Sequence, residues 1–397
     1  MSRIVLGLGN TVDYELQWDS GVLERLILEY GIRSDEIRDF DSVHSEREMI
    51  LSVLHFFRDS TGGERFVADP SVIRQFAGRF RTKTALGGTP VRAALAMEKV
   101  GCSAFLHLTV MDEWVRRLLP AGCGYVCSAD KENSTPHLIL QFYPGSRIKA
   151  GEIDLTALRA NRLIYDNDRE NMEMKLNRAL EKELRDAEVF LVSGFNAVRD
   201  RALLEERMDE LLDMMKCLPE QSVIFYEDGC FHFPEYTGVI WEKLLDEITV
   251  YSMNEDELQA YAKRTLRLDN PEEIYAALIE LRKMIPAKTL LIHTGAWVLA
   301  YGENPQRWRN AIGGGIAMAA TRYRKGDGFT AEDYRETEDL PLQEAGKRFA
   351  AGIEKLAGEN VCCLPCIQAK VKNPVTIGLG DSFVGGFLAA WVRDGER

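Results

Sequence analysis

The chain has 397 residues, of which 46% are hydrophobic and 28% are charged. This length and composition can bury a large core and leave room for one big domain and a smaller one. The net charge of −13, from 49 basic and 62 acidic residues, argues against nucleic acid or an anionic membrane as the main partner, although a small anionic ligand is compatible with it.

No targeting or membrane segment is predicted. The first residues turn polar too early for a signal peptide, and no run of 18 or more apolar residues occurs. Eight cysteines without a secretory signal indicate reduced thiols. We therefore expect a cytoplasmic protein with no membrane partner, and the sequence leaves its oligomeric state open.

The first predicted strand covers residues 4–6 and runs into a Gly-Leu-Gly turn. Asn10 and Asp13 follow this strand at its carboxyl end, which is where open α/β sheets bind their ligands. The turn is therefore a candidate for holding substrate hydroxyls through Asp13. A capping aspartate in a solvated loop is an equally common arrangement.

Two glycines at 87 and 88 open a helix predicted over residues 91–100, after a mainly helical stretch at 19–81. Backbone amides at Gly87 and Gly88 could meet a ligand, because glycine lets the backbone approach closely.

Short strands at 104–108 and 137–142 predict a small β-rich subdomain between residues 103 and 148. Its basic side chains are either solvated charges or anchors for an anionic substrate. They are Lys131, Arg147 and Lys149.

Helices and strands alternate from residue 171 onward, which predicts a parallel sheet with helices on both faces. The expected strands are 189–193, 223–226, 248–251 and 289–293, and the expected helices are 171–184, 200–215, 254–263 and 272–284. A further helix is predicted to open at the glycines 313–315.

Two acidic groups follow strands of this predicted sheet. Glu227 ends one strand, and Glu257 lies in the first turn of the helix that Asn254 opens. Mg²⁺ carried by a nucleotide keeps several waters and takes one or two protein carboxylates, which these residues could supply. A capping box of Asn254 and Glu257 is the structural alternative.

The sequence Thr376-Ile377-Gly378-Leu379-Gly380-Asp381 joins a β-branched segment to an apolar helix through a glycine turn. The free amides and dipole of such a helix start attract phosphate. Asp381 could deprotonate a hydroxyl that attacks this phosphate. An ordinary turn with Asp381 as helix cap is about equally common.

These residues, in this order, resemble the ADP-dependent sugar kinases, a branch of the ribokinase-like superfamily. The resemblance runs from Asn10 to Asp381. Its signatures are the Asn10/Asp13 turn, Gly87-Gly88, Asn161-Arg162-Leu163-Ile164, Ser193-Gly194-Phe195-Asn196, Asn254-x-x-Glu257, His293-Thr294, the helix 313–320, and Gly378-Leu379-Gly380-Asp381.

The resemblance implies an α/β protein with a ribokinase-like three-layer α/β/α domain and a smaller, mainly β lid. Residues 1–13, 75–102 and 165–397 would form the large nucleotide-binding domain. Residues 14–74 and 103–164 would form the lid, which holds substrate.

The resemblance also implies the reaction and the role of each residue. The β-phosphoryl group of ADP would pass to a sugar or sugar phosphate, with fructose 6-phosphate as the first acceptor to test and Mg²⁺ as cofactor. Asp381 would be the base, with Arg162 and the amides of Gly378 and Gly380 at the phosphates. The other roles would be acceptor binding by Asn10, Asp13, Gly87 and Gly88, nucleotide binding by His293, Gly313, Gly314 and Leu379, and organisation of the metal by Glu227 and Glu257.

Three positions depart from the family pattern. Phe225 replaces the histidine of the family's His-x-Glu motif, and Thr11 replaces the usual asparagine before Asp13. Ala160 stands where glucokinase members carry glutamate, which is more similar to the phosphofructokinase members.

Two alternatives stay open. An ATP-dependent ribokinase-like kinase of a sugar or nucleoside would keep the fold and change the donor. A nucleotide- or sugar-binding protein without catalysis would account for Phe225.

Overall fold

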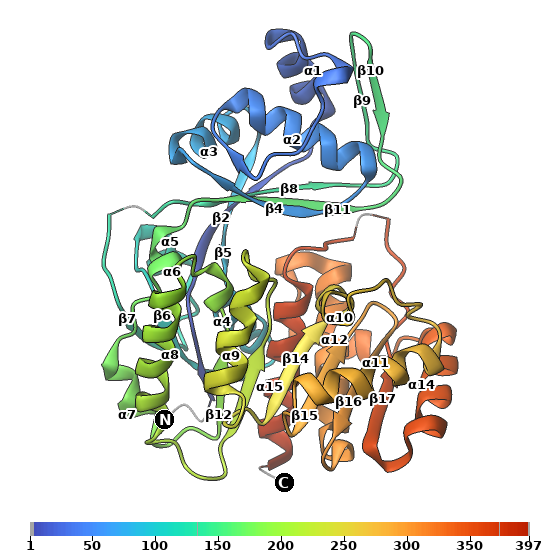
Figure 1. The fold of residues 1–397 in the computed structure, drawn as a ribbon. Coiled ribbons are helices and arrows are strands. Elements are labelled where there is room, and N and C mark those ends of the chain that lie inside the picture. Colours follow the sequence, from blue (N-terminus) through green and yellow to red (C-terminus); the bar gives the residue numbers. More distant parts are fainter. Residues whose placement is uncertain (1–3, 133, 373, 396–397) are drawn as a thin grey trace.

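The computed structural model describes residues 4–132, 134–372 and 374–395, which form a large α/β body and a smaller lid above it (Figure 1). A nine-stranded sheet organises the large body, and a six-stranded sheet organises the lid. The predicted three-layer α/β/α domain is confirmed. The smaller lid was predicted to be mainly β, and it is built on a β-sheet that also carries helices on one face.

The large sheet is parallel except for β16, which runs antiparallel to both of its neighbours. Parallel strands need crossover connections, so their carboxyl ends gather at one edge of the sheet. In spatial order the strands are β17 (Val361–Pro365), β16 (Trp297–Gly302), β15 (Thr289–His293), β14 (Val250–Asn254), β13 (Val223–Glu227), β12 (Val189–Val192), β1 (Ile4–Leu6), β6 (Phe105–Leu108) and β7 (Gly124–Cys127).

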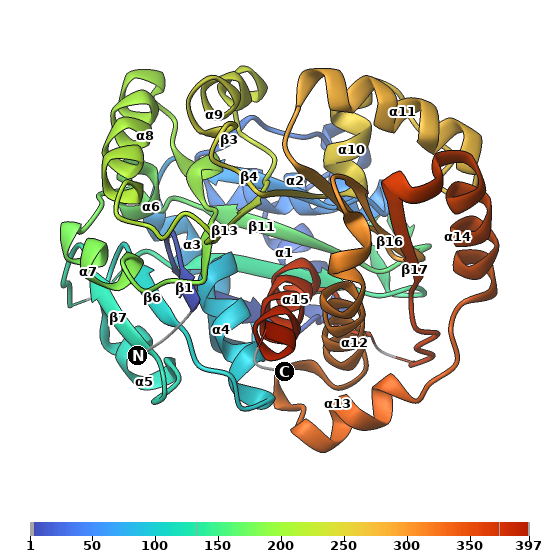
Figure 2. The same cartoon turned by 90° about the horizontal axis from the view of Figure 1, so that it is seen from below.

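Helices cover both faces of this sheet (Figure 2). One layer contains α6 (Arg169–Glu173), α7 (Glu181–Leu184), α8 (Arg201–Met215), α9 (Thr237–Leu244), α10 (Glu255–Ala262), α11 (Pro271–Met284) and α14 (Glu344–Ala357). The other contains α4 (Thr89–Lys99), α5 (Glu113–Leu118), α12 (Arg309–Lys325), α13 (Ala331–Glu338) and α15 (Leu379–Gly395).

Strand β13 shows why both faces are apolar. Ile224 and Tyr226 pack into the core on the α8 side, whereas Val223 and Phe225 pack into the core on the α15 side. A strand buried on both faces loses the alternation of polar and apolar residues that marks a half-exposed strand. Among the described residues, none of the helices combines the length and apolar composition needed to cross a membrane.

The lid sheet carries helices on its outer face only. Its strands, in spatial order, are β3 (Ser42–Val43), β4 (Gly63–Val67), β11 (Asn161–Asp166), β8 (His137–Phe142), β2 (Thr11–Leu16) and β5 (Thr82–Gly87). The outer face packs on α1 (Ser20–Glu29), α2 (Glu46–Asp59), α3 (Pro70–Ala77) and the hairpin of β9 (Arg147–Ala150) and β10 (Ile153–Thr156). Alternation along the strands turns the other face toward the large domain.

The predicted domain boundaries differ from the structure at three whole strands and at the ends of two more, β2 and β11. Strand β5 was expected in the large domain, but it pairs with β2 in the lid. Strands β6 and β7 were expected in the lid, but they extend the large sheet beside β1. A short apolar strand has the same side-chain period in either sheet, so its sequence does not reveal its pairing partner. Residues 1–3 and 396–397 of the predicted large domain lie outside the described residues.

Helix α12 begins at Arg309, so Gly313 and Gly314 lie inside it rather than at its start, which corrects the prediction of a glycine-opened helix. Gly314 is a packing position. A Cβ there would lie 2.5 Å from the Ala390 Cβ and 2.8 Å from the Gly386 carbonyl oxygen of α15. Gly314 therefore lets α12 and α15 approach closely, which helps to fix the position of α15.

Gly313→Ala and Gly314→Ala form a matched pair, because the two residues are adjacent in one helix. A Cβ at Gly313 meets nothing within 4 Å, and we expect its substitution to raise the free energy of unfolding by up to about 1 kcal/mol through helix propensity. At Gly314 we expect a loss of about 1–3 kcal/mol from overpacking. Urea unfolding of both variants measures this difference, and equal effects would contradict the packing role of Gly314.

Candidate active site

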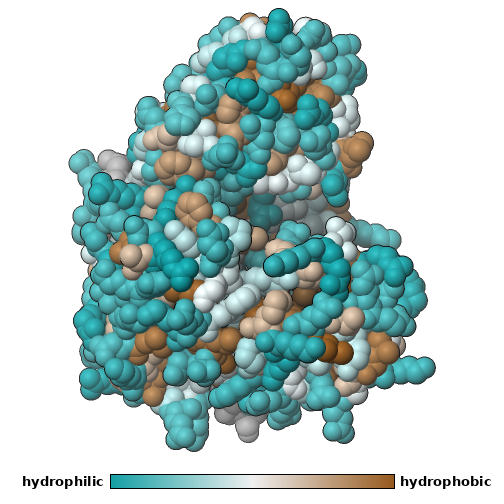
Figure 3. All heavy atoms as spheres, in the orientation of Figure 1, coloured by the Kyte–Doolittle hydropathy of each residue, from teal (hydrophilic) through white to brown (hydrophobic). Residues whose placement is uncertain are grey.

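A cleft of about 1420 Å³ lies between the lid and the carboxyl ends of the large sheet. The space-filling view shows the hollow between the two bodies (Figure 3). Lid residues such as Glu64, Arg162 and Asp166 line one side, and Glu227 and Asp381 line the other. The cleft therefore has the position that the resemblance implies for the substrates.

The glycine turn before α15 opens onto this cleft. Gly378 has a φ of +67°, a backbone conformation that favours glycine. The Ser382 N–H bonds to the Gly378 carbonyl at 3.0 Å, so the preceding amides have no acceptor inside the helix. Gly378, Leu379, Gly380 and Asp381 all line the cleft, which makes this turn a suitable place for an anion.

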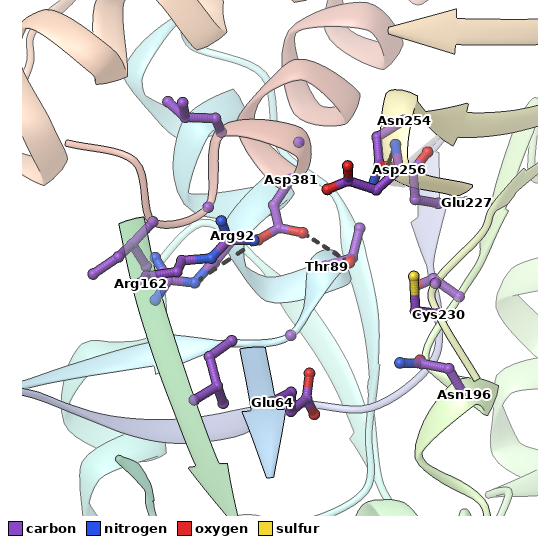
Figure 4. A pocket seen from close by; sticks show the side chains of 18 of the residues that line it. Glu64, Thr89, Arg92, Arg162, Asn196, Glu227, Cys230, Asn254, Asp256 and Asp381 are labelled. Atoms are coloured by element: carbon purple, nitrogen blue, oxygen red, sulfur yellow. Dashed lines mark hydrogen bonds and ion pairs between the residues drawn. The ribbon is translucent and has the colours of Figure 1, made fainter. Parts of the chain in front are cut away.

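Helix α4 holds both carboxylate oxygens of Asp381 (Figure 4). The Thr89 hydroxyl donates to Oδ1 at 2.8 Å, and the Arg92 Nε lies 3.9 Å from Oδ2. Sequence analysis missed Thr89 and Arg92. The available signal was their place directly after Gly87-Gly88, together with a basic side chain on an otherwise apolar helix.

Arg92 is a buried cation, 5% exposed, surrounded by carboxylates of different segments. Its Nη2 donates to Asp13 Oδ2 at 2.6 Å and to Glu15 Oε1 at 3.3 Å. Burial opposes this charge, but the carboxylates of Asp13, Asp381 and Glu15 outweigh burial and raise the pKa of Arg92 above its usual value. Arg92 thus joins the predicted acceptor-binding residue Asp13 to the predicted base Asp381.

These ion pairs continue from the lid back to the glycine turn. Lys83 on β5 pairs with Glu15 at 3.2 Å and with Asp327 of the large domain. Asp327 also pairs with Arg322 of α12, and the Arg322 Nε donates to the Ile377 carbonyl at 2.7 Å. We call the series Asp381, Arg92, Glu15, Lys83, Asp327 and Arg322 the charge ring, because it leaves the glycine turn at Asp381 and returns to it at Ile377.

A second contact between the lid and the glycine turn is made by Gln141 of β8. Its Nε2 donates to the Pro374 carbonyl at 3.0 Å, and its Oε1 accepts from the Thr376 hydroxyl at 3.0 Å. The segment before the turn is therefore held by a lid side chain.

The structure places Phe225 away from the cleft. Its ring is fully buried and lies 5.2 Å from the ring of Phe387 on α15. An imidazole from another strand contacts Glu227 instead of a histidine at position 225. His293 Nε2 lies 3.0 Å from Glu227 Oε1. His293 also stacks on Phe383 with a centroid distance of 4.9 Å.

Glu227 is suited to a metal carried by nucleotide. Its Oε2 is buried and has no hydrogen-bond partner among the described residues, and its side chain lines the cleft. Glu257 does not line the cleft; its Oε2 accepts from the Asn254 N–H at 2.8 Å in a capping box. The described residues contain no cluster of three or more His, Cys, Asp or Glu side chains arranged to hold a metal.

Most of the predicted site residues meet in this cleft. Those that line it are Asn10, Asp13, Gly88, Arg162, Glu227, His293, Gly378, Leu379, Gly380 and Asp381. Gly87, Glu257, Gly313 and Gly314 do not line it. Instead of the α12 glycines, the cleft is lined by the α12 side chains Ile316, Ala319, Ala320 and Tyr323.

The three basic residues predicted as anchors of an anionic substrate lie outside the cleft. Lys131 pairs with Glu170, and Arg147 pairs with Asp154 at 2.6 Å on the β9–β10 hairpin. Lys149 lies on the same hairpin, beyond the outer face of the lid. These positions favour the alternative of surface charges, because Arg147 and Lys149 lie on an outer hairpin and Lys131 lies on the connection after β7, bonded to the Met111 carbonyl of the large domain.

His137, at the start of β8, is a partly buried cation of the lid. Burial opposes its charge, but the hydrogen bond with Asp168 and the nearby charges of Asp166 and Asp13 raise its pKa to about 10. Between the usual value of about 6.5 and this value, the folded state binds a proton that the unfolded state has lost, so stability falls as the pH rises.

We therefore expect His137→Gln to lower the free energy of unfolding by about 2 kcal/mol near pH 7. The difference from the wild type should be largest below pH 6.5, shrink through pH 10, and then level off. Urea unfolding of both proteins from pH 6 to pH 10.5 tests this dependence. A difference that does not vary with pH would contradict a protonated His137.

The family described as ADP-specific phosphofructokinase/glucokinase conserved region matches residues 2–389. A phosphofructokinase from Pyrococcus horikoshii OT3, solved with AMP, is 16% identical with a TM-score of 0.76 and covers 100% of this chain and 99% of that chain. An ADP-dependent kinase in complex with fructose-6-phosphate and ADPβS is 13% identical with a TM-score of 0.74, covering 98% of this chain and 94% of that one. No curated protein sequence matches the chain.

Proposed function

Because this chain belongs to the ADP-specific phosphofructokinase/glucokinase family and is an ADP-dependent sugar kinase, we propose that it transfers the β-phosphoryl group of ADP to a hydroxyl of a sugar or sugar phosphate, with Asp381 as the base.

The observation that carries this proposal is the environment of Asp381. Its carboxylate faces the cleft from the first turn of α15, beside amides that can bind a phosphoryl group. Thr89 and Arg92 orient it from α4. A hydroxyl bound near Asp13 and Gly88 would thus lie between the base and the glycine turn, and the base would accept its proton as it attacks the phosphorus.

The lid supplies the remaining charge. Arg162 of β11 is exposed in the cleft, and its guanidinium makes no ion pair with another described residue. We assign it to the phosphates of ADP, where it would help to neutralise the transferring group. Closure of the lid would exclude water and so limit hydrolysis of the nucleotide.

Mg²⁺ fits the Glu227 side of the cleft, where the buried Oε2 lacks a partner. Glu227 would hold the ion or one of its waters, and Glu257 would fix the neighbouring helix start through its capping box. When bound with the nucleotide, the ion supplies positive charge to the phosphates.

Fructose 6-phosphate is the first sugar phosphate to test, since the similar kinase described above is in complex with it and the small residue Ala160 lines the cleft. The departure at Thr11 does not remove Asp13 from the cleft, because the Thr11 hydroxyl donates to Asp13 Oδ1 at 2.7 Å.

The test is a product assay that crosses ADP, ATP and GTP with glucose, fructose and fructose 6-phosphate, with Mg²⁺ and with a chelator. We expect phosphorylated product with ADP, lost when the chelator removes the metal. Product with ATP alone would support an ATP-dependent kinase instead. Tight binding of nucleotide and sugar without product in any combination would support a binding protein without catalysis.

A further inference from the structure

The cleft-facing side of the lid carries two carboxylates that the proposed reaction does not use. Glu64 on β4 and Asp166 on β11 lie on the same face of the lid sheet, since Glu64 pairs in register with Ile164 and Asp166 follows two residues later. Both line the cleft. Figure 4 shows Glu64 across the cleft from Asp381.

Neither carboxylate has a full set of partners. Asp166 is only 6% exposed, and its Oδ2 is buried without a hydrogen bond. Its Oδ1 lies 3.6 Å from Arg199. The Glu64 side chain is exposed in the cleft and forms no hydrogen bond or ion pair with the other described residues. A carboxylate as buried as that of Asp166 is costly unless a donor or a cation completes it.

The charges around this pair leave one negative charge uncompensated once Arg162, the cation near Glu64 that pairs with no other described residue, is engaged by the phosphates of ADP. The carboxylates are Glu64, Asp166 and Asp168, and the other cations are Arg199 and the protonated His137. His232 lines the same part of the cleft, and burial lowers its pKa, so it is neutral near pH 7. Burial and the neighbouring carboxylate raise the pKa of Glu64, and burial also raises that of Asp166. Both directions are those of carboxylates for which the effect of burial outweighs that of the nearby cations.

The pair adjoins the place expected for the acceptor. Asp13 pairs in register with His137 across β2 and β8, and the charge of Asp166 acts on the same His137. An acceptor whose hydroxyls bind Asp13 would therefore reach toward Glu64 and Asp166 with its other end. A phosphate at that end would meet carboxylates, because Arg199 and His137 are already paired and Arg162 is assigned to the phosphates of ADP.

We infer that Glu64 and Asp166 form a subsite for a protonated amine of the acceptor, so that the preferred acceptor is an amino-bearing sugar or polyol. This inference rests on the proposed function and narrows its acceptor class. An ammonium group brings one positive charge and three donors, which match the uncompensated charge and the open acceptor sites of the two carboxylates.

The test compares amine and hydroxyl at one carbon by isothermal titration calorimetry. The probes are glucosamine against glucose, and 1-amino-1-deoxyfructose against fructose, with fructose 6-phosphate as the anionic comparison. We expect an amine to bind about 10-fold more tightly than its hydroxyl partner in at least one pair. The same ranking is expected in kcat/KM with ADP. Binding is measured without turnover, so absent kinase activity would overturn the proposed function and leave the subsite testable.

The variants are Glu64→Gln and Asp166→Asn, with Asp41→Asn as the control. Asp41 also lines the cleft but lies outside the carboxylate pair. Glu64→Gln loses no protein partner, so it should fold even if Asp166→Asn does not. We expect Glu64→Gln to remove most of the preference for the amine and to leave the affinity for glucose within a few-fold, whereas Asp41→Asn keeps the preference.

Three results would overturn the subsite. They are equal affinities within both pairs, an equal loss of preference in Glu64→Gln and Asp41→Asn, and tighter binding of fructose 6-phosphate than of either amine. If a neutral sugar bound as tightly as its amine partner only after potassium was added, the subsite would hold a free cation. That result would also overturn the inference about the acceptor.

Discussion

Asp381→Asn is expected to lower kcat by about 10²–10⁴-fold, because the amide can no longer accept the proton of the attacking hydroxyl. The substitution keeps the shape of the side chain and an oxygen that can accept from the Thr89 hydroxyl. The affinity for ADP should therefore change little. Steady-state kinetics with ADP and the best acceptor, together with nucleotide titration, measure both quantities.

Asp394→Asn is the matched control, since Asp394 lies in the last turn of the same helix and accepts from the Asn310 side chain at 2.6 Å. It should leave kcat unchanged. If Asp381→Asn turned over at nearly the wild-type rate, Asp381 would not be the base and the glycine turn would serve only to bind phosphate.

Arg92→Met is the second substitution with a large expected effect. It leaves the carboxylates of Asp13, Glu15 and Asp381 without their shared cation in a buried place. We expect a loss of about 3–5 kcal/mol in the free energy of unfolding. Because Asp381 also loses one of its two supports, kcat of the folded protein should fall on the order of 10²-fold. For Arg92→Lys, both the free energy of unfolding and kcat should lie between those of the wild type and of Arg92→Met, because lysine keeps the charge but not the planar set of donors.

Two comparisons separate positioning by Arg92 from a general loss of stability. Arg79→Met removes ion pairs to Glu29 and to the buried Glu46, which lie in the lid away from the cleft, so it should destabilise the fold without changing kcat of the folded protein. The double variant Arg92→Met/Asp381→Asn should have a kcat only slightly lower than that of Asp381→Asn alone. Full additivity would show that Arg92 does not act through Asp381.

The charge ring gives a physical reason to expect coupling between lid and base. It runs from Asp381 and Arg92 of the large domain to Glu15 and Lys83 on lid strands, and back to Asp327 of the large domain. Burial alone would raise the pKa of Asp327, but Arg322 and Lys83 lower it well below its usual range. The carboxylate therefore stays charged, and the ring is complete at neutral pH.

Local sequence determined much of this protein. The glycine turn at Gly378, the start of α15 near Asp381, and the alternation of strands and helices after residue 171 were all predicted, because turn conformation, helix starts and side-chain periodicity depend on neighbouring residues. The break of the predicted helix 171–184 into α6 and α7 was not predicted, and neither was the early start of α12. Boundaries of this kind depend on packing partners as well as on propensity.

Only the tertiary structure decided how these elements meet. Thr89 and Asp381 are 292 positions apart, and His293 reaches Glu227 from another strand. No local pattern encodes such contacts. A charged side chain on a helix or loop has the same sequence signature whether it is solvated, like Arg147, or enclosed by carboxylates, like Arg92. The sequence therefore determined the turn that presents Asp381, whereas the packing of α4, α15 and the lid sheet determined which charges surround it.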